Sequence, residues 1–196
     1  MKSSYLRAGA ALACALALSA CGGGDGDRVI SGSFSGVTRP GLVLQNNGGS
    51  DLVINPTNDG SGRFYFPDMV ETDSDYNVTA KSFPSNAETC KVTNGKGKVA
   101  IDINTIYVEC TIRQHELKGT VNGLTGNNLV LVNGSDRVAV PAGATSFTMA
   151  KVNEDAPYGV AVLTQPDNQT CTVANGSGTV GQAAITNVTV NCGPRT

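Results

Sequence analysis

The sequence has little of what enzymes use for catalysis. Among 196 residues there is one histidine, His115, and no tryptophan. His115 falls in the short stretch between two repeated segments, beside Glu116, so we expect neither a Ser-His-Asp triad nor a histidine-rich metal site. It is predicted to be a solvated connector residue. Paired carboxylates could still hydrolyse glycosides, but they need a cleft, and the acids here fall in predicted surface loops. We therefore expect no enzyme.

Basic residues and long apolar runs are also scarce. Lys and Arg number 14 against 16 Asp and Glu, and no cluster of basic residues stands out. Binding to nucleic acid requires clustered Lys and Arg, so we expect no nucleic-acid partner. The longest apolar stretch, Ala8 to Ala17, is shorter than the roughly 20 residues that span a bilayer.

What is abundant is typical of β-structure. Val, Ile and Leu supply most apolar positions and stand among Gly, Asn, Thr and Ser. Short alternating runs are separated by turn residues at about the 8–12 residue spacing of a β-sandwich. No segment shows sustained helical periodicity. In the first half, strands are predicted over residues 29–35, 41–45, 51–54, 63–66, 76–82, 90–93, 98–101 and 105–111.

An internal repeat defines the domain organisation. The segment from Ile30 to Val37 recurs 87 residues later, and the segment from Cys90 to Gly95 recurs 81 later. The shrinking offset indicates shorter loops in the second copy. Each copy of about 80 residues is long enough for its own core. The sequence therefore predicts two tandem β-sandwiches, at 29–112 and 113–196, sitting end to end because so few residues join them.

The first 21 residues resemble a bacterial lipoprotein signal. Lys2 and Arg7 precede the apolar run, and Leu18-Ser19-Ala20-Cys21 closes it. In that family the peptidase cuts before the cysteine, which implies that residues 1–20 are removed and that Cys21 is acylated. Residues 21–28 would then form an acylated, glycine-rich tether. Gly22 after the cysteine implies sorting to the outer membrane, on its periplasmic face or at the cell surface.

The cysteines follow the repeat. Without Cys14 and Cys21, four remain, and four cysteines allow three pairings. Because the spacing of Cys90 and Cys110 recurs in Cys171 and Cys192, the economical pairing is one disulfide inside each copy, in the oxidising cell envelope. A zinc site is the alternative, but these cysteines lack the closely paired spacing that zinc ligands show.

Both copies resemble a module of proteobacterial lipoproteins and surface proteins. The similarity rests on the segments Gly119 to Leu124, Leu129 to Gly134, Cys171 to Gly178 and Asn187 to Cys192, with counterparts in the first copy. It implies immunoglobulin-like or prealbumin-like sandwiches, and it implies no catalytic residue and no cofactor.

Three smaller features lead to further hypotheses. The acids Asp68, Glu71, Asp73 and Asp75 precede Tyr76, as Asn153-Glu154-Asp155 precedes Tyr158, and their oxygens could bind Ca²⁺ or form a solvated loop. Tyr76 and Tyr158 could be tyrosine corners or core aromatics. The Asn-Gly pairs at 94–95 and 175–176 predict type I′ hairpin turns.

We therefore expect a lipid-anchored envelope protein that acts as a non-catalytic structural or interaction module. Its predicted partners are the membrane, through Cys21, and an envelope or surface protein. The alternative is a carbohydrate- or small-ligand-binding module, with Ca²⁺ as a candidate ligand. That function requires an aromatic platform or a concave polar pocket, for which Tyr65 and Tyr107 are the exposed candidates.

Overall fold

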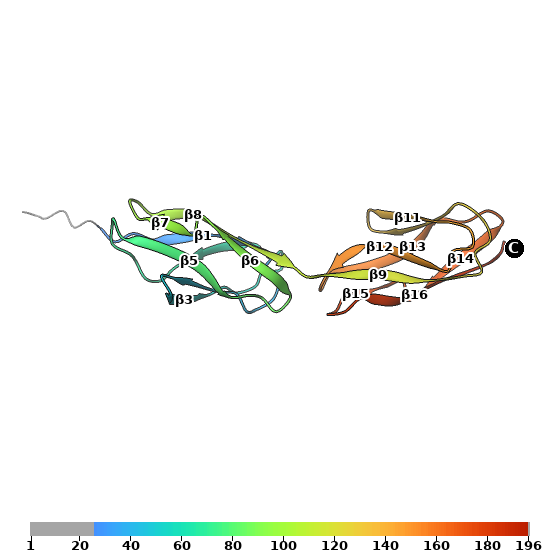
Figure 1. Ribbon diagram of the computed structural model, residues 1–196, viewed down its shortest axis with the longest axis horizontal. Coiled ribbons are helices and arrows are strands. Elements are labelled where there is room, and N and C mark those ends of the chain that lie inside the picture. Colours follow the sequence, from blue (N-terminus) through green and yellow to red (C-terminus); the bar gives the residue numbers. More distant parts are fainter. Residues whose placement is uncertain (1–25, 196) are drawn as a thin grey trace, which may run out of the picture.

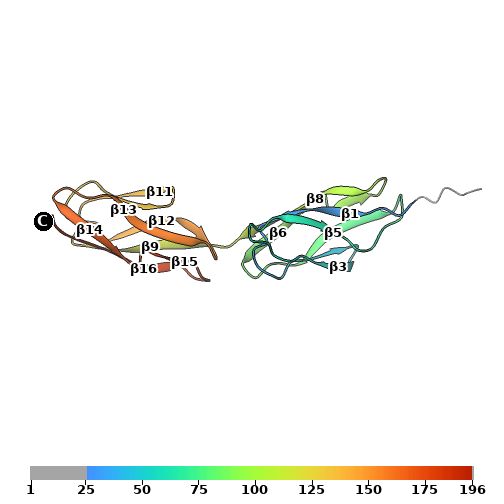
Figure 2. The ribbon, with the colours of Figure 1, turned by 180° about the vertical axis from the view of Figure 1, so that it is seen from behind.

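A computed structural model describes residues 26–195, which form strands and loops and no helix. The strands build two β-sandwiches that follow one another along the long axis of the molecule (Figure 1). The view from behind shows the same two bodies joined by a single narrow connection (Figure 2). The prediction of an all-β chain with two tandem sandwiches is confirmed.

The first sandwich consists of two four-stranded sheets. One has the order β4-β1-β8-β6, with β1 parallel to β8 and the other pairs antiparallel. The other has the order β3-β2-β5-β7 and is antiparallel throughout. The strands are β1 (Ile30–Ser35), β2 (Val43–Asn46), β3 (Gly49–Val53), β4 (Gly62–Tyr65), β5 (Asp75–Ser82), β6 (Ala87–Thr93), β7 (Lys96–Lys98) and β8 (Ile103–Ile112).

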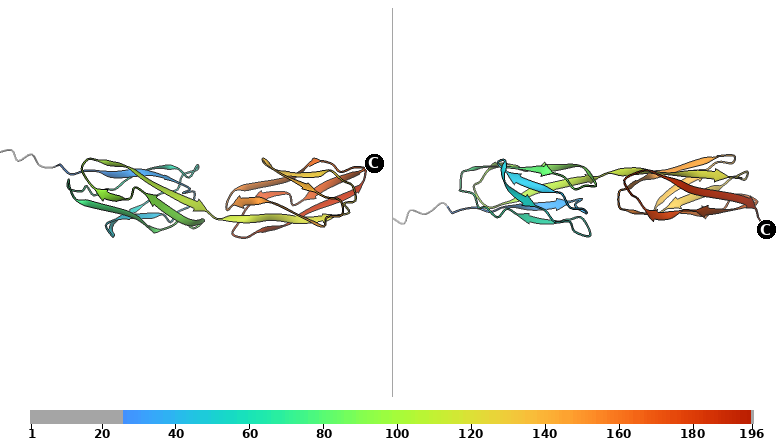
Figure 3. Two further views of the ribbon diagram at one scale, coloured as in Figure 1. Left: turned by 45° about the horizontal axis from the view of Figure 1, so that its top comes forward. Right: turned by 90° about the horizontal axis from the view of Figure 1, so that it is seen from below.

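The second sandwich repeats this topology strand for strand. Its sheets have the orders β12-β9-β16-β14 and β11-β10-β13-β15, again with one parallel pair, β9 with β16. The two layers of each sandwich are visible in the turned views (Figure 3). The strands are β9 (Gln114–Asn122), β10 (Leu129–Asn133), β11 (Asp136–Val140), β12 (Ser146–Asn153), β13 (Pro157–Thr164), β14 (Gln169–Ala174), β15 (Ser177–Thr179) and β16 (Ile185–Pro194).

Each sandwich has a core of its own. Alternate residues of the strands point inward, as the regular alternation of exposed and buried positions along β9 shows. The fully buried large side chains of the first core include Ile30, Leu42, Leu44 and Ile106, and those of the second include Leu117, Leu129, Leu131 and Val188. No buried residue belongs to both clusters.

One predicted strand is misplaced. The strand expected over residues 98–101 is β7, which ends at Lys98, and Ile101 is exposed. The ladder stops because Val99 bonds to the loop before β5: its N–H donates to the carbonyl of Ser74 (2.9 Å), and its own carbonyl accepts from the N–H of Asp73 (2.7 Å). The chain then crosses to the other sheet and begins β8.

The Asn-Gly pairs do not make hairpins, so that prediction is wrong. Strands β6 and β7, on either side of Asn94-Gly95, lie in different sheets, and so do β14 and β15 around Asn175-Gly176. Asn94 takes a φ of 56° and its side-chain amide donates to the carbonyl of Thr105 (3.0 Å). A Cβ on Gly95 would lie 2.6 Å from the carbonyl oxygen of Val78. Glycine therefore lets the chain approach β5 as it changes sheet.

Candidate functional site

The four paired cysteines form one disulfide in each sandwich, Cys90–Cys110 and Cys171–Cys192. Each bridge joins directly opposed residues of neighbouring strands, β6 with β8 and β14 with β16. The pairing expected from the repeat is confirmed, and it replaces the zinc alternative. The predicted acylation site, Cys21, lies outside the described residues.

The junction between the sandwiches is shorter than expected. Strand β8 ends at Ile112 and β9 begins at Gln114, which leaves Arg113 alone between them. The Arg113 N–H donates to the carbonyl of Asn86 in the first sandwich (3.0 Å). Its carbonyl accepts from the N–H of Glu154 in the second sandwich (2.8 Å). The backbone of the connector is thus held from both sides.

A second contact ties Asp155 of the second sandwich to Arg39 of the first. The Arg39 guanidinium donates to both carboxylate oxygens, with Nε at 2.7 Å from Oδ2 and Nη2 bonded to Oδ1. Such a forked pair fixes orientation as well as distance. The amide of Asn86, which is fully buried, donates to the same Oδ2 (3.0 Å) and to the hydroxyl of Thr38 (2.9 Å).

Glu154 is the buried carboxylate of the junction, with its side chain 1% exposed. One of its oxygens, Oε2, lies 3.3 Å from Nε of Arg113 and 3.3 Å from Nε2 of His115. Burying a carboxylate is costly unless it is paired and hydrogen-bonded, so both partners are needed there. We call the group of Arg39, Asn86, Arg113, His115, Glu154 and Asp155 the junction clamp.

The structure corrects the interpretation of His115 as a solvated connector residue. His115 belongs to β9, its side chain is 17% exposed, and its ring contacts Glu154. The reason is the length of the connection: with Arg113 alone between the sandwiches, the first residues of β9 already pack against the loop that carries Glu154.

The charges of the clamp favour the ionised form of Asp155. The hydrogen bonds from Arg39 lower the pKa of this carboxyl below its ordinary value, partial burial opposes the shift, and the Asn86 amide adds to it. The pKa of Arg39 is raised in return, first by its hydrogen bond to Asp155. The pair therefore stays charged to a lower pH than an aspartate of ordinary pKa would allow.

The acidic side chains considered as Ca²⁺ ligands, in the segment before Tyr76, do not converge on one point. Asp68 accepts a hydrogen bond from Ser50 (2.6 Å), and Asp75 lies 3.9 Å from the amino group of Lys98. Within residues 26–195, no group of three or more His, Cys, Asp or Glu side chains comes together to hold a metal ion. The second copy uses the matching carboxylates, Glu154 and Asp155, in the clamp.

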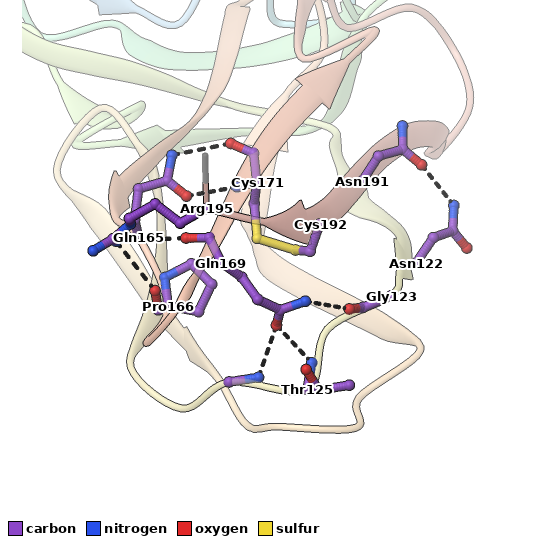
Figure 4. The surroundings of a disulfide bond; sticks show 11 residues. Asn122, Gly123, Thr125, Gln165, Pro166, Gln169, Cys171, Asn191, Cys192 and Arg195 are labelled. Carbon is purple, nitrogen blue, oxygen red and sulfur yellow. Dashed lines mark hydrogen bonds between the residues drawn. A yellow bond between two sulfur atoms is a disulfide. The ribbon is translucent and has the colours of Figure 1, made fainter.

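The far end of the second sandwich is closed by its own side chains (Figure 4). Gln169 is buried close to the Cys171–Cys192 bridge. Its side-chain oxygen accepts from the N–H groups of Thr125 and Gly126, both at 2.8 Å, and its amide donates to the carbonyl of Gly123 (2.7 Å). Gln169 thus supplies the hydrogen-bond partner of three backbone groups in this loop.

The tyrosines within residues 26–195 divide into two classes. Tyr76 and Tyr158 are buried, and the Tyr76 hydroxyl donates to the carbonyl of Asn94 (3.1 Å), which ties the crossover between the sheets. Tyr65 and Tyr107 lie on the outer face of the first sandwich, 58% and 38% exposed. Tyr107 shares a hydrogen bond with Ser35 (2.7 Å), whereas the ring of Tyr65 is open to solvent.

Arg39, Asn86 and Arg113 were missed by reasoning from sequence. The repeat contained one signal: Arg39 aligns with Gly126 at the offset of 87, so a long cation stands in the first copy where the second has no side chain. Nothing in the sequence, however, showed that this loop faces the second copy.

Comparison with family models and with curated sequences gives no match. Among solved structures, the chain is similar to the major pilin T3.2 of Streptococcus pyogenes (12% identity, 86% of this chain and 98% of that one, TM-score 0.36). It is also similar to the Bacillus anthracis TIE protein (13%, 84% and 34%, TM-score 0.42). A third is a two-repeat B unit of the Staphylococcus aureus collagen-binding protein (14%, 86% and 49%, TM-score 0.31). Likeness at these scores does not place the chain in a family.

The described residues contain no helix of the length and apolar character needed to cross a membrane.

Proposed function

We propose that this chain is a lipid-anchored protein of the bacterial cell envelope that acts as a non-catalytic structural or interaction module. The observation that carries the proposal is the junction clamp, which joins the two sandwiches through the backbone of Arg113, a forked ion pair and a buried carboxylate. A flexible linker would need none of these contacts. The clamp suits a protein whose task is to hold its two halves in a fixed order along one axis.

The positions of the chain ends support a role as a spacer. The described chain begins at one extremity of the molecule and ends near the other (Figure 1). With an acyl group on Cys21 and a short tether, the first sandwich would stand next to the membrane. The second sandwich would then present its far end to partners in the periplasm or outside the cell.

The arrangement of polar side chains supports a role without catalysis. The imidazole of His115 is largely buried and contacts Glu154 within the clamp. The carboxylates beside it, Glu154 and Asp155, are paired with Arg113 and Arg39. These groups bond to one another at the junction and hold the two sandwiches in one geometry. Hydrolysis of ester, glycoside or peptide substrates by the purified chain would contradict this part of the proposal.

Replacement of the acylation site tests the anchor. In cells given labelled palmitate, the wild-type chain should take up label and sediment with the outer membrane, because several acyl chains hold a protein stably where one is marginal. Cys21→Ala should remain unlabelled and leave the membrane fraction, while the control Cys14→Ala should behave as wild type. An unlabelled wild type overturns the anchor, and sedimentation with the inner membrane overturns the outer-membrane location.

A further inference from the structure

The outer face of the sheet β4-β1-β8-β6 contains a hollow that the proposed function does not use. It has a volume of about 330 Å³ and lies over β1, between β4 and the beginning of β8. This volume is at the small end of the roughly 300–1,000 Å³ range of ligand sites. Its lining consists of Val29, Ser31, Gly32, Arg63, Tyr65, Asp102 and Asn104.

The hollow exists because Ser31, the outward-facing residue of its floor, has a small side chain, whereas the Cβ position of Gly32 faces the core ring of Phe64. Ser31 and Gly32 are buried in β1, and the Ser31 hydroxyl is turned down to the carbonyl of Ile103 (2.9 Å). The parallel register between β1 and β8 is shifted between Ile30 and Gly32, which displaces the start of β8 from the sheet. Residues with larger side chains line the hollow on either side of β1.

The walls differ in chemistry. Arg63 and Tyr65 lie on the β4 side, and Tyr65 is 58% exposed. On the β8 side stand the exposed residues Asp102 and Asn104. One oxygen of Asp102 accepts from the N–H of Val29 (3.0 Å), which holds the carboxylate in place beside the hollow. A tyrosine and an arginine on one side of the hollow therefore oppose a carboxylate and an amide on the other.

The second sandwich supplies an internal control, because the same sheet there has different residues at these positions. The strand registers align Tyr65 with Thr148 and Arg63 with Ser146. Ser31 aligns with Lys118, whose amino group bonds to Glu116 across the same surface (2.8 Å). At the offset of 82, Ala184 and Thr186 stand in place of Asp102 and Asn104. The fold is shared by both copies, but the aromatic and polar walls occur in the first alone.

We propose that this hollow binds one sugar ring of a glycan. An exposed tyrosine face packs against the C–H groups of a pyranose, while a carboxylate, an amide and a guanidinium match its hydroxyl groups as acceptors and donors. Arg63 and Asp102 carry opposite charges, so the hollow as a whole favours a neutral ligand over a strongly charged one. The volume accommodates one ring, with the rest of the glycan leaving over the open surface.

The test uses the mature chain with Cys21→Ala, so that no lipid is attached, and a panel of neutral mono- and oligosaccharides. Amide signals are followed by nuclear magnetic resonance during each titration. We expect at least one saccharide to shift the signals of Gly32, Tyr65 and Asn104 in a saturable way and to leave those of Gly119, Thr148 and Thr186 unchanged. If no saccharide does so, or if the shifts fall in the second sandwich, the proposal is overturned.

Matched variants separate a specific site from general surface contact. Tyr65→Ala should weaken binding roughly tenfold, since it removes the stacking face, while Thr148→Ala should have no effect. Ser31→Lys places the residue of the second copy in the floor and should abolish binding, and Lys118→Ser is its control. An unchanged amide spectrum of the second sandwich and of the first core serves as the control that each variant is folded. Binding that survives both Tyr65→Ala and Ser31→Lys overturns the proposal.

Discussion

Each sandwich has an end that lies toward the C-terminus of the chain; in the first sandwich this end is the junction. The two ends share one backbone arrangement but are completed by different side chains. In each, an arginine N–H donates to the carbonyl of an asparagine in the opposite loop: Arg113 to Asn86 (3.0 Å) and Arg195 to Asn168 (3.1 Å). The first end is then completed by the neighbouring sandwich through Arg39 and Asp155. The second is completed by Gln169, which stands where the first copy has Ala87.

The difference shows that one loop framework can be completed by a neighbouring sandwich or by a side chain of its own sandwich. Asn86 is fully buried at the joint, whereas its counterpart Asn168 is exposed. Gly126, the counterpart of Arg39, leaves no room for a side chain, because a Cβ there would lie 2.3 Å from the carbonyl oxygen of Asp167. The second end therefore lacks a counterpart of the Arg39 cation, and Gln169 satisfies its loop from within.

Removal of a disulfide is the change with the largest expected effect. Cys90→Ser with Cys110→Ser, or Cys171→Ser with Cys192→Ser, opens a loop of 20 or 21 residues. Each should cost its own sandwich about 3 kcal/mol and leave the other's transition in place. Denaturant unfolding, followed by resonances of each half, measures this. If either pair of substitutions destabilises both halves equally, the sandwiches do not fold as separate units.

Gln169→Ala places alanine in the second sandwich, where the first sandwich has Ala87 at the same position. It leaves the N–H groups of Thr125 and Gly126 and the carbonyl of Gly123 without their partner, so we expect a loss of about 1–3 kcal/mol in the free energy of unfolding of the second sandwich. The exposed Gln182→Ala is the matched control and should change stability by less than about 0.5 kcal/mol. Equal effects of the two substitutions would show that Gln169 does not close this end.

Arg39→Gly places glycine in the first sandwich, where the second sandwich has Gly126 at the same position. The ion pair with Asp155 is partly exposed, so the stability of each sandwich should change little. The orientation of the halves should change more than their stability. In residual dipolar couplings, the wild type should fit one alignment tensor for both sandwiches, and the variant should need two. A variant that still fits one tensor would place the rigidity in Arg113 and Glu154 alone.

Acidification should release the same contact, with the smallest effect of the series. Because the folded protein lowers the pKa of Asp155, its pairing with Arg39 contributes fully above the ordinary pKa range of an aspartate and is lost as the pH falls through the lower, folded value. The side-chain N–H resonance of Arg39 should report this loss. Asp155→Asn should show no such transition, and an identical transition in that variant would assign it to another group.

Much of the fold could be predicted from the sequence, because its signals are local or repeated. The period-two alternation of apolar residues gave most strands to within about three residues of their observed bounds. Recurrence of Cys90 and Cys110 as Cys171 and Cys192 identified the pairing of the disulfides. The short stretch between the copies predicted an end-to-end arrangement. None of these depends on which sheet a strand joins or on which loop meets another.

Contacts between segments far apart in the chain were decided by the tertiary structure alone. Asn94-Gly95 has the sequence of a hairpin turn, yet it connects two sheets, because β6 finds its partner in β8 and β7 in β5. His115 is partly shielded from solvent because Glu154, 39 residues away, lies against it. The pair of Arg39 and Asp155 spans 116 residues and carries no local signal. Sequence periodicity determines which face of a strand is buried, whereas the partner of a polar side chain depends on the closing of the whole chain.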